Sequence, residues 1–188
     1  LVDNIMIGKL GKVAIAGVAL ANEISFIFLI ITYGIVTGAA IFFSQFWGKK
    51  DIKSIHQIMG ICYRLSLLLS IIFFIGSRFF PSEIMSLYSK DQAVVDVGTD
   101  YLKLISFSFP LTAIAMTISN VLRSTEKVKP PLIFSAIGIV LNSILNLMLI
   151  FGLFIFPELG VKGAAIATVT ARLVETVILV IYSYNKKL

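Results

Sequence analysis

Long apolar runs, separated by short polar breaks, account for most of the chain. A membrane-spanning helix needs roughly 20 predominantly apolar residues, and five runs reach that length. They cover about residues 14–47, 58–80, 94–122, 131–156 and 160–184. Residues 1–7 have the character of the end of one more apolar helix. The pattern therefore predicts an all-α, polytopic membrane protein with five full spanning helices and a truncated first helix.

The composition supports a membrane protein and leaves no room for a soluble domain. Of the 188 residues, 58% are hydrophobic and 14% are charged, and the mean hydropathy is +0.98. Soluble domains carry about 25% charged residues. We therefore expect one transmembrane domain over residues 1–188. The chain begins with Leu1 rather than with Met, and we expect it to be a fragment of a longer protein, truncated at both ends.

Several function classes find no support in the sequence. The net charge of +6 is spread over helix ends without a basic groove, so nucleic acid is not an expected partner. The single cysteine, Cys62, allows no internal disulfide and no metal cluster. His56, the only histidine, lies among lysines and is expected to be solvated. The motifs of zinc proteases, nucleophile elbows and phosphate loops do not occur, so we expect neither an enzyme nor a bound cofactor.

The basic residues of the polar breaks predict the orientation in the membrane. Eight of them lie in the loops after the first, third and fifth runs: Lys49, Lys50, Lys53, Arg123, Lys127, Lys129, Lys186 and Lys187. Five lie in the other three loops: Lys9, Lys12, Arg78, Lys90 and Lys162. Because cytoplasmic loops carry the excess of lysine and arginine, the richer set is predicted to be cytoplasmic.

Two amides interrupt the fourth apolar run. Asn142 and Asn146 are four residues apart and share a helical face with Ser135 and Gly138. Hydrocarbon offers an amide no hydrogen-bond partner, so this face is predicted to look inward. Thr168 of the fifth run can face the amides if the two runs form a hairpin. Two interpretations stay open, because such amides can merely join helices or can form part of a pathway.

Other polar and small residues mark the remaining runs. Asp3 is an acid in an apolar setting, and ionisable groups inside a membrane usually mark an ion or substrate path. Gly34 and Gly38 form a GxxxG pattern that permits close helix packing. Pro110 lies inside the third run and predicts a kink there. In the fifth run, Arg172 and Glu175 are three residues apart and can pair on one face.

Four motifs in this order resemble the MATE (multidrug and toxic compound extrusion) family, most closely its NorM-like branch. They are VDNIMIG at residues 2–8, SQFWGKKD at 44–51, LNSILN at 141–146 and PELGVKGAAIAT at 157–168. The resemblance runs over the whole chain. It implies a transporter of twelve helices in two six-helix lobes, of which this chain is the N-terminal lobe with its first helix truncated. The missing C-terminal lobe is then an expected partner.

The resemblance also implies a site and an activity. Asp3 matches the acid of helix one that binds a proton or a coupling cation, and Asn142 and Asn146 match polar residues of helix five that complete the network. Thr168 matches a contributor from helix six. Na⁺ at Asp3 and Asn142 is one implied option, and no other metal is expected. The implied activity is antiport, coupled to H⁺ or Na⁺, that exports cationic and lipophilic compounds across a bacterial cell membrane by alternating access.

Two alternatives remain at this stage. Lipid-linked oligosaccharide flippases share the architecture, but their cavity is expected to be more cationic, to hold pyrophosphate. Intramembrane arginine is here limited to Arg64, near the end of a run, and Arg172. A scaffold that transports nothing is the other alternative, and such a protein would not need Asp3.

Overall fold

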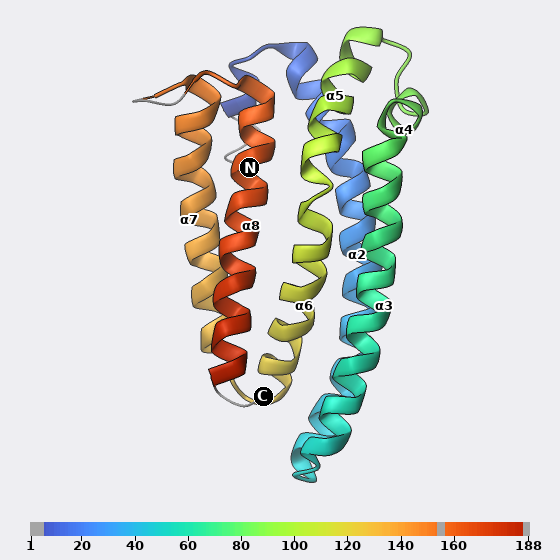
Figure 1. Cartoon of the computed structure of the whole chain (residues 1–188), viewed down its shortest axis with the longest axis vertical. Coiled ribbons are helices and arrows are strands. Elements are labelled where there is room, and N and C mark those ends of the chain that lie inside the picture. The colour runs from blue at the N-terminus through green and yellow to red at the C-terminus, as the bar shows by residue number, and fades with distance from the viewer. Residues whose placement is uncertain (1–5, 154–156, 186–188) are drawn as a thin grey trace.

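The computed structural model describes residues 6–153 and 157–185. Within these ranges the chain forms helices and no strand, and the long helices run side by side (Figure 1). The helices are α2 (Lys12–Gly48), α3 (Ile52–Phe79), α4 (Pro81–Ser86), α5 (Gln92–Ile105), α6 (Ser108–Ser124), α7 (Lys129–Phe151) and α8 (Gly160–Asn185). Four of them, α2, α3, α7 and α8, are each long and apolar enough to cross a membrane, and there are five such spans if the bent pair of α5 and α6 is counted as one. The predicted all-α membrane fold is confirmed.

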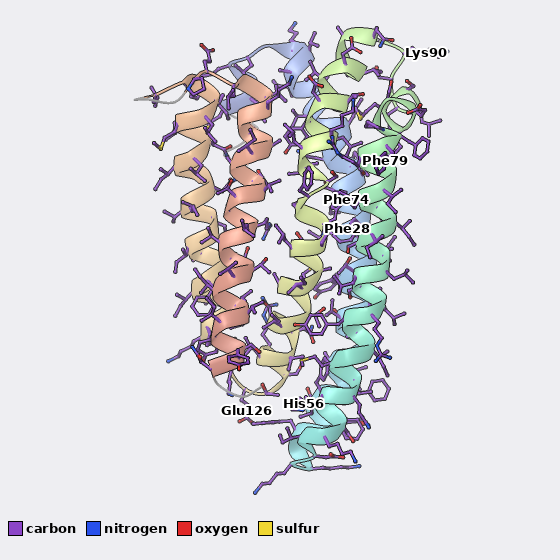
Figure 2. The ribbon with its side chains drawn as sticks, viewed as in Figure 1. Phe28, His56, Phe74, Phe79, Lys90 and Glu126 are labelled. Carbon is purple, nitrogen blue, oxygen red and sulfur yellow. The ribbon has the colours of Figure 1, made fainter. Side chains whose placement is uncertain are left out.

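The chain passes up and down through the bundle, so that alternate loops lie at the same end. The ends of α2, α6 and α8 all lie toward the lower end in Figure 1, with the end of α2 the lowest. His56 and Glu126 mark this end, and Lys90 marks the opposite end (Figure 2). Large apolar side chains such as Leu68, Ile139 and Leu132 are exposed on the outside of the bundle. Such an outer surface suits lipid hydrocarbon rather than water.

The third predicted helix, 94–122, is in fact two helices. α5 ends at Ile105 and α6 begins at Ser108, and the two are bent by 49°. Pro110 is the physical reason, because a proline ring clashes with the carbonyl four residues earlier, which here belongs to Ser106. The prediction of a kink at Pro110 therefore has the right cause, but the break lies about one turn before the proline itself.

Two other predicted boundaries differ from the structure. The helix predicted at 58–80 begins six residues earlier, because the Asp51 side chain accepts a hydrogen bond from the Ser54 amide at 3.1 Å and caps α3. His56 is therefore helical, although it is exposed as expected. The helix predicted at 131–156 ends at Phe151, because Gly152 adopts a left-handed conformation (φ 64°). The predicted residues 154–156 lie outside the described residues.

Close helix packing occurs at other glycines than Gly34 and Gly38. A Cβ at either position would meet no atom within 4 Å, so no helix among the described residues packs against that GxxxG face. A Cβ on Gly17 of α2 would lie 2.9 Å from the Val94 carbonyl oxygen of α5. The small-residue start of α8 does permit close approach, because a Cβ on Gly163 would lie 2.5 Å from the Leu149 carbonyl oxygen of α7.

An aromatic cluster joins α2, α3 and α6, on the side of the bundle away from α7. Phe28 lies at its centre, with its ring centroid 5.4 Å from that of Phe73 and 4.8 Å from that of Phe109. Figure 2 shows Phe28 about midway along the bundle. The rings are tilted or edge-on to one another, which is the arrangement that aromatic pairs prefer. The helices α2, α3 and α6 are therefore joined by apolar ring contacts, whereas α7 and α8 carry polar residues.

Candidate functional site

Asn142, Asn146 and Thr168 form one hydrogen-bonded chain between α7 and α8. The buried Asn146 donates from Nδ2 to Asn142 Oδ1 at 3.1 Å. Asn142 donates in turn from Nδ2 to Thr168 Oγ1 at 3.1 Å, and Thr168 donates to the Ala164 carbonyl oxygen at 3.0 Å. The side chains that the sequence singled out in these two helices are therefore brought together inside the protein, away from lipid.

The hairpin of α7 and α8 explains why these side chains meet. Gly163 lets the two backbones approach closely, and the Leu159 amide donates to the Leu149 carbonyl oxygen at 2.9 Å across the turn. Thr168 lies roughly one and a half turns after Gly163, which is the level at which Asn142 lies opposite. A bulkier residue in place of Gly163 would separate the helices and lengthen the bond between Asn142 and Thr168.

Asp3 lies outside the described residues, but the described end of the same segment packs against the turn of the α7–α8 hairpin. Ile7 is 1% exposed and belongs to the apolar cluster that includes Ile150 and Ala164. Ile150 follows Asn146 by one helical turn, and Ala164 precedes Thr168 by one turn. The first segment of the chain therefore shares an apolar cluster with residues of the α7–α8 hairpin.

Two partly open pockets lie beside α8, on the side that faces α2 and α6. The upper pocket, of about 150 Å³, is lined by polar residues that include Asn22, Ser25, Ser108 and Thr168, and also by Phe28. The lower pocket, of about 180 Å³, extends toward the end of the bundle at which α6 ends and α7 begins. The upper pocket gives the amide chain access to open space, because Thr168 belongs to both.

Arg172 is the residue that the sequence analysis did not assign to the site. It lines both pockets, as does Thr112. The predicted pairing with Glu175 is present, with Arg172 Nη1 2.8 Å from Glu175 Oε2. An arginine within an apolar run was the available signal, but i, i+3 pairing also suits a surface helix. Only the structure places Arg172 between two interior pockets.

Residues 6–153 and 157–185 contain no cluster of side chains of the kind that binds a metal ion. No group of three or more His, Cys, Asp or Glu side chains in these ranges could hold a metal ion. The Na⁺ site suggested at Asp3 and Asn142 involves a residue outside these ranges and stays a prediction. Amide and hydroxyl oxygens of the kind gathered here are hard ligands, which suit Na⁺ better than they suit transition metals.

Known proteins share both the sequence and the fold. A family model described as MatE matches residues 1–148. The chain is 27% identical over 188 residues to the "Probable multidrug resistance protein YoeA" of Bacillus subtilis, covering 100% of this chain and 41% of that protein. It is 25% identical to the "Probable multidrug resistance protein NorM" of Thermotoga maritima, with coverage of 98% and 40%.

A solved structure extends the likeness to three dimensions. The structure of the "MATE multidrug transporter DinF-BH" matches with a TM-score of 0.89 and 27% identity, over 98% of this chain and 41% of that one. The chain thus spans about 40% of the length of the proteins that it resembles. These relatives are transporters rather than enzymes. The family match over residues 1–148 and the all-helical fold together show that this multi-pass membrane protein belongs to the MatE family.

Proposed function

We propose that the chain forms the N-terminal lobe of an exporter of lipophilic cations that is coupled to H⁺ or Na⁺. The observation that carries this proposal is the hydrogen-bonded chain from the buried Asn146 through the half-buried Asn142 to Thr168. Structural glue between two helices needs one such bond. A chain of three polar side chains beside an interior pocket is better suited to a site that takes up and releases a small ion.

Asp3 is the proposed coupling group, with Asn142, Asn146 and Thr168 as its neighbours. The support is its match to the family motif and the burial of Ile7, four residues on, beside the α7–α8 hairpin. Burial favours a neutral carboxyl group, whereas a bound cation favours the carboxylate. A proton and a Na⁺ or substrate cation would therefore compete for Asp3, which is the requirement for exchange.

A second lobe is needed for alternating access. In that mechanism two halves rock against each other around a central site, and each half supplies one wall. The chain spans about 40% of its relatives, so a second lobe of similar size is the partner that we propose. The lipid bilayer of a bacterial inner membrane would surround both lobes.

The test uses the protein expressed from its complete gene in inverted membrane vesicles. Movement of a fluorescent lipophilic cation such as ethidium is measured under an imposed proton or sodium gradient. Asp3→Asn keeps the volume and the hydrogen-bonding groups but removes the titratable acid, so coupled movement should fall to background. Asp3→Glu should retain part of it.

Glu23→Gln is the matched control, because Glu23 is an exposed acid of α2 that lines neither pocket. It should leave the movement of the dye unchanged. The proposal would be wrong if Asp3→Asn moved ethidium at the wild-type rate under both gradients. It would also be wrong if the wild-type protein moved the dye without responding to either gradient.

A further inference from the structure

Arg172 and Glu175 form an ion pair whose two members lie in different surroundings. The Glu175 side chain is 8% exposed, whereas that of Arg172 is 42% exposed. Glu175 packs against α7, where a Cβ on Gly138 would lie 3.3 Å from its Oε2. The acid is thus enclosed between two helices, and the guanidinium borders the two pockets.

The charges around the lower pocket are predominantly positive. Its charged lining residues are Arg123, Arg172 and Glu175, and Arg172 is the one charged residue that lines the upper pocket within the described residues. Glu175 is already paired with Arg172, so the charge of Arg123 makes the net charge of the lower pocket positive. A guanidinium carries five N–H donors. Of these, the described residues engage Arg172 through Nη1 alone.

Neutral groups in the lower pocket would complete a site for an amphipathic molecule. Ser119, Ser135 and Asn120 line it, and Asn120 Oδ1 has no hydrogen-bond partner among the described residues. Amide oxygen and nitrogen are interchangeable by rotation, so Asn120 can offer a donor or an acceptor to a ligand. Tyr33 and Met116 supply apolar surface in the same pocket.

We propose that this lower pocket, which we call the arginine pocket, binds a carboxylate or phosphate group of an amphipathic molecule. Arg172 would bind two oxygens of that group side by side, as guanidinium groups do with carboxylates and phosphates. Glu175 is the positioning residue, because it fixes one edge of the guanidinium and leaves the rest toward the pocket. A volume of about 180 Å³ suits such a head group and is smaller than the roughly 300 Å³ of a complete small-molecule site.

This inference rests on the proposed export function in one respect: it names the class of molecule that the exporter selects. Among lipophilic cations, those that also carry an acidic group should be preferred over those that do not. An anionic lipid head group presents the same chemistry to the same pocket. The experiment must therefore separate an exported molecule from a lipid, and it must separate both from a merely structural ion pair.

A matched pair of dyes tests the preference. One is a rhodamine with a free carboxylate, and the other is the ethyl ester of the same rhodamine, so that the two differ only in the acidic group. Binding is measured by fluorescence anisotropy on the protein from its complete gene, in nanodiscs of phosphatidylcholine. The wild-type protein should bind the acid more tightly than the ester. The double variant Arg172→Gln/Glu175→Gln should lose about tenfold or more in affinity for the acid and keep its affinity for the ester.

The double variant avoids a folding failure, because it removes both charges and leaves no buried acid without its partner. Arg64→Gln is the control, since Arg64 is an exposed arginine of α3 that lines neither pocket, and it should change neither affinity. Arg172→Lys keeps the charge but loses the planar fork, and should weaken binding of the acid less than the double variant does.

A second arm adds phosphatidylglycerol to the nanodiscs. If a lipid head group fills the pocket, this lipid should weaken binding of the acid to the wild-type protein and have no such effect on the double variant. Equal affinities of acid and ester for the wild-type protein, with no effect of phosphatidylglycerol, would overturn the proposal. An equal loss of affinity for both dyes in the double variant would also overturn it, because that result would make the ion pair structural. Ethidium movement in vesicles tests the export function separately.

Discussion

The two sides of the helix bundle are held by different chemistry. On one side, Phe28, Phe73 and Phe109 pack α2, α3 and α6 through three ring contacts. On the other, α7 and α8 approach at Gly163 and are joined by a hydrogen bond between Asn142 and Thr168. Ring packing depends on shape and area alone, whereas the polar contacts need particular donors and acceptors.

This difference separates stability from specificity. Removing a large buried ring costs about 3–5 kcal/mol, whereas a hydrogen bond between membrane helices contributes about 0.6–2 kcal/mol. The aromatic side should therefore hold most of the stability, and the α7–α8 side should hold the interactions that respond to ions and ligands. Substitutions in the ring cluster should therefore act mainly on unfolding, and substitutions of the polar residues of α7 and α8 should act mainly on transport.

The largest expected effect comes from the aromatic side. Phe28→Ala should lower the free energy of unfolding by about 3 kcal/mol, because it removes a fully buried ring and leaves a cavity between three helices. Phe79→Ala is the control, since Phe79 is 68% exposed near the end of α3 and should change little. Unfolding of both variants is followed by circular dichroism in detergent. If both variants lost the same free energy of unfolding, the ring cluster would not be the main source of stability on that side of the bundle.

The closest approach of α7 and α8 should give the next largest effect. Gly163→Ala places a methyl group 2.5 Å from a backbone carbonyl of α7, which forces the helices apart at a cost of about 1–3 kcal/mol. Gly34→Ala is the matched control, because a Cβ there meets nothing within 4 Å. Alanine favours helix over glycine by about 1 kcal/mol, so this control should be neutral or stabilising. Thermal unfolding in detergent measures both variants. A stable Gly163→Ala protein would mean that the two helices can separate without cost.

Features that depend on neighbouring residues could be predicted from the sequence. Apolar run length placed the spanning helices, and the four-residue spacing of Asn142 and Asn146 placed both on an inward face. Pro110 predicted a break, although its position one turn earlier follows from the clash with the Ser106 carbonyl. These features depend on a few neighbouring residues, so they can be inferred without the fold.

Contacts between distant segments could not be inferred in this way. The GxxxG pattern at Gly34 and Gly38 resembles a packing surface, yet no described helix covers it, whereas Gly17 and Gly163 lie at close approaches. Arg172 has the spacing of a surface ion pair, and its place between two pockets depends on α2, α6 and α7 together. Which helix covers which face is decided by the whole bundle, and no local pattern encodes it.

The hydrogen-bonded chain should have a small effect on stability and a large one on transport. Asn142→Leu keeps the approximate volume but removes the bonds to Thr168 and Asn146, so unfolding should become easier by about 1–2 kcal/mol. Ethidium movement in vesicles should nevertheless fall to background. Ser143→Ala is the control, because the exposed Ser143 hydroxyl donates to the Ile139 carbonyl of its own helix. If Asn142→Leu retained ion-coupled transport, the amides would be structural.

The smallest expected effect lies at the turn between α2 and α3, where the aromatic side has a polar contact of its own. Asp51 accepts hydrogen bonds from the Ser54 hydroxyl at 2.7 Å and from the Ser54 amide at 3.1 Å. These bonds, together with Lys53 and Lys49, hold the pKa of Asp51 below its ordinary value of 3.8. A carboxyl group whose pKa is lower in the folded state stabilises the protein above its unfolded pKa, and this contribution is lost as the pH falls through the folded value. Asp51→Asn keeps a good helix cap without a titratable acid, so wild-type and variant melting temperatures should differ slightly at pH 6 and converge as the pH falls below 3.8 and through the lower folded value. If the difference in melting temperature persisted at the lower pH, the effect would come from the shape of the cap rather than from its charge. The turn between α2 and α3 would then make no pH-dependent contribution to stability.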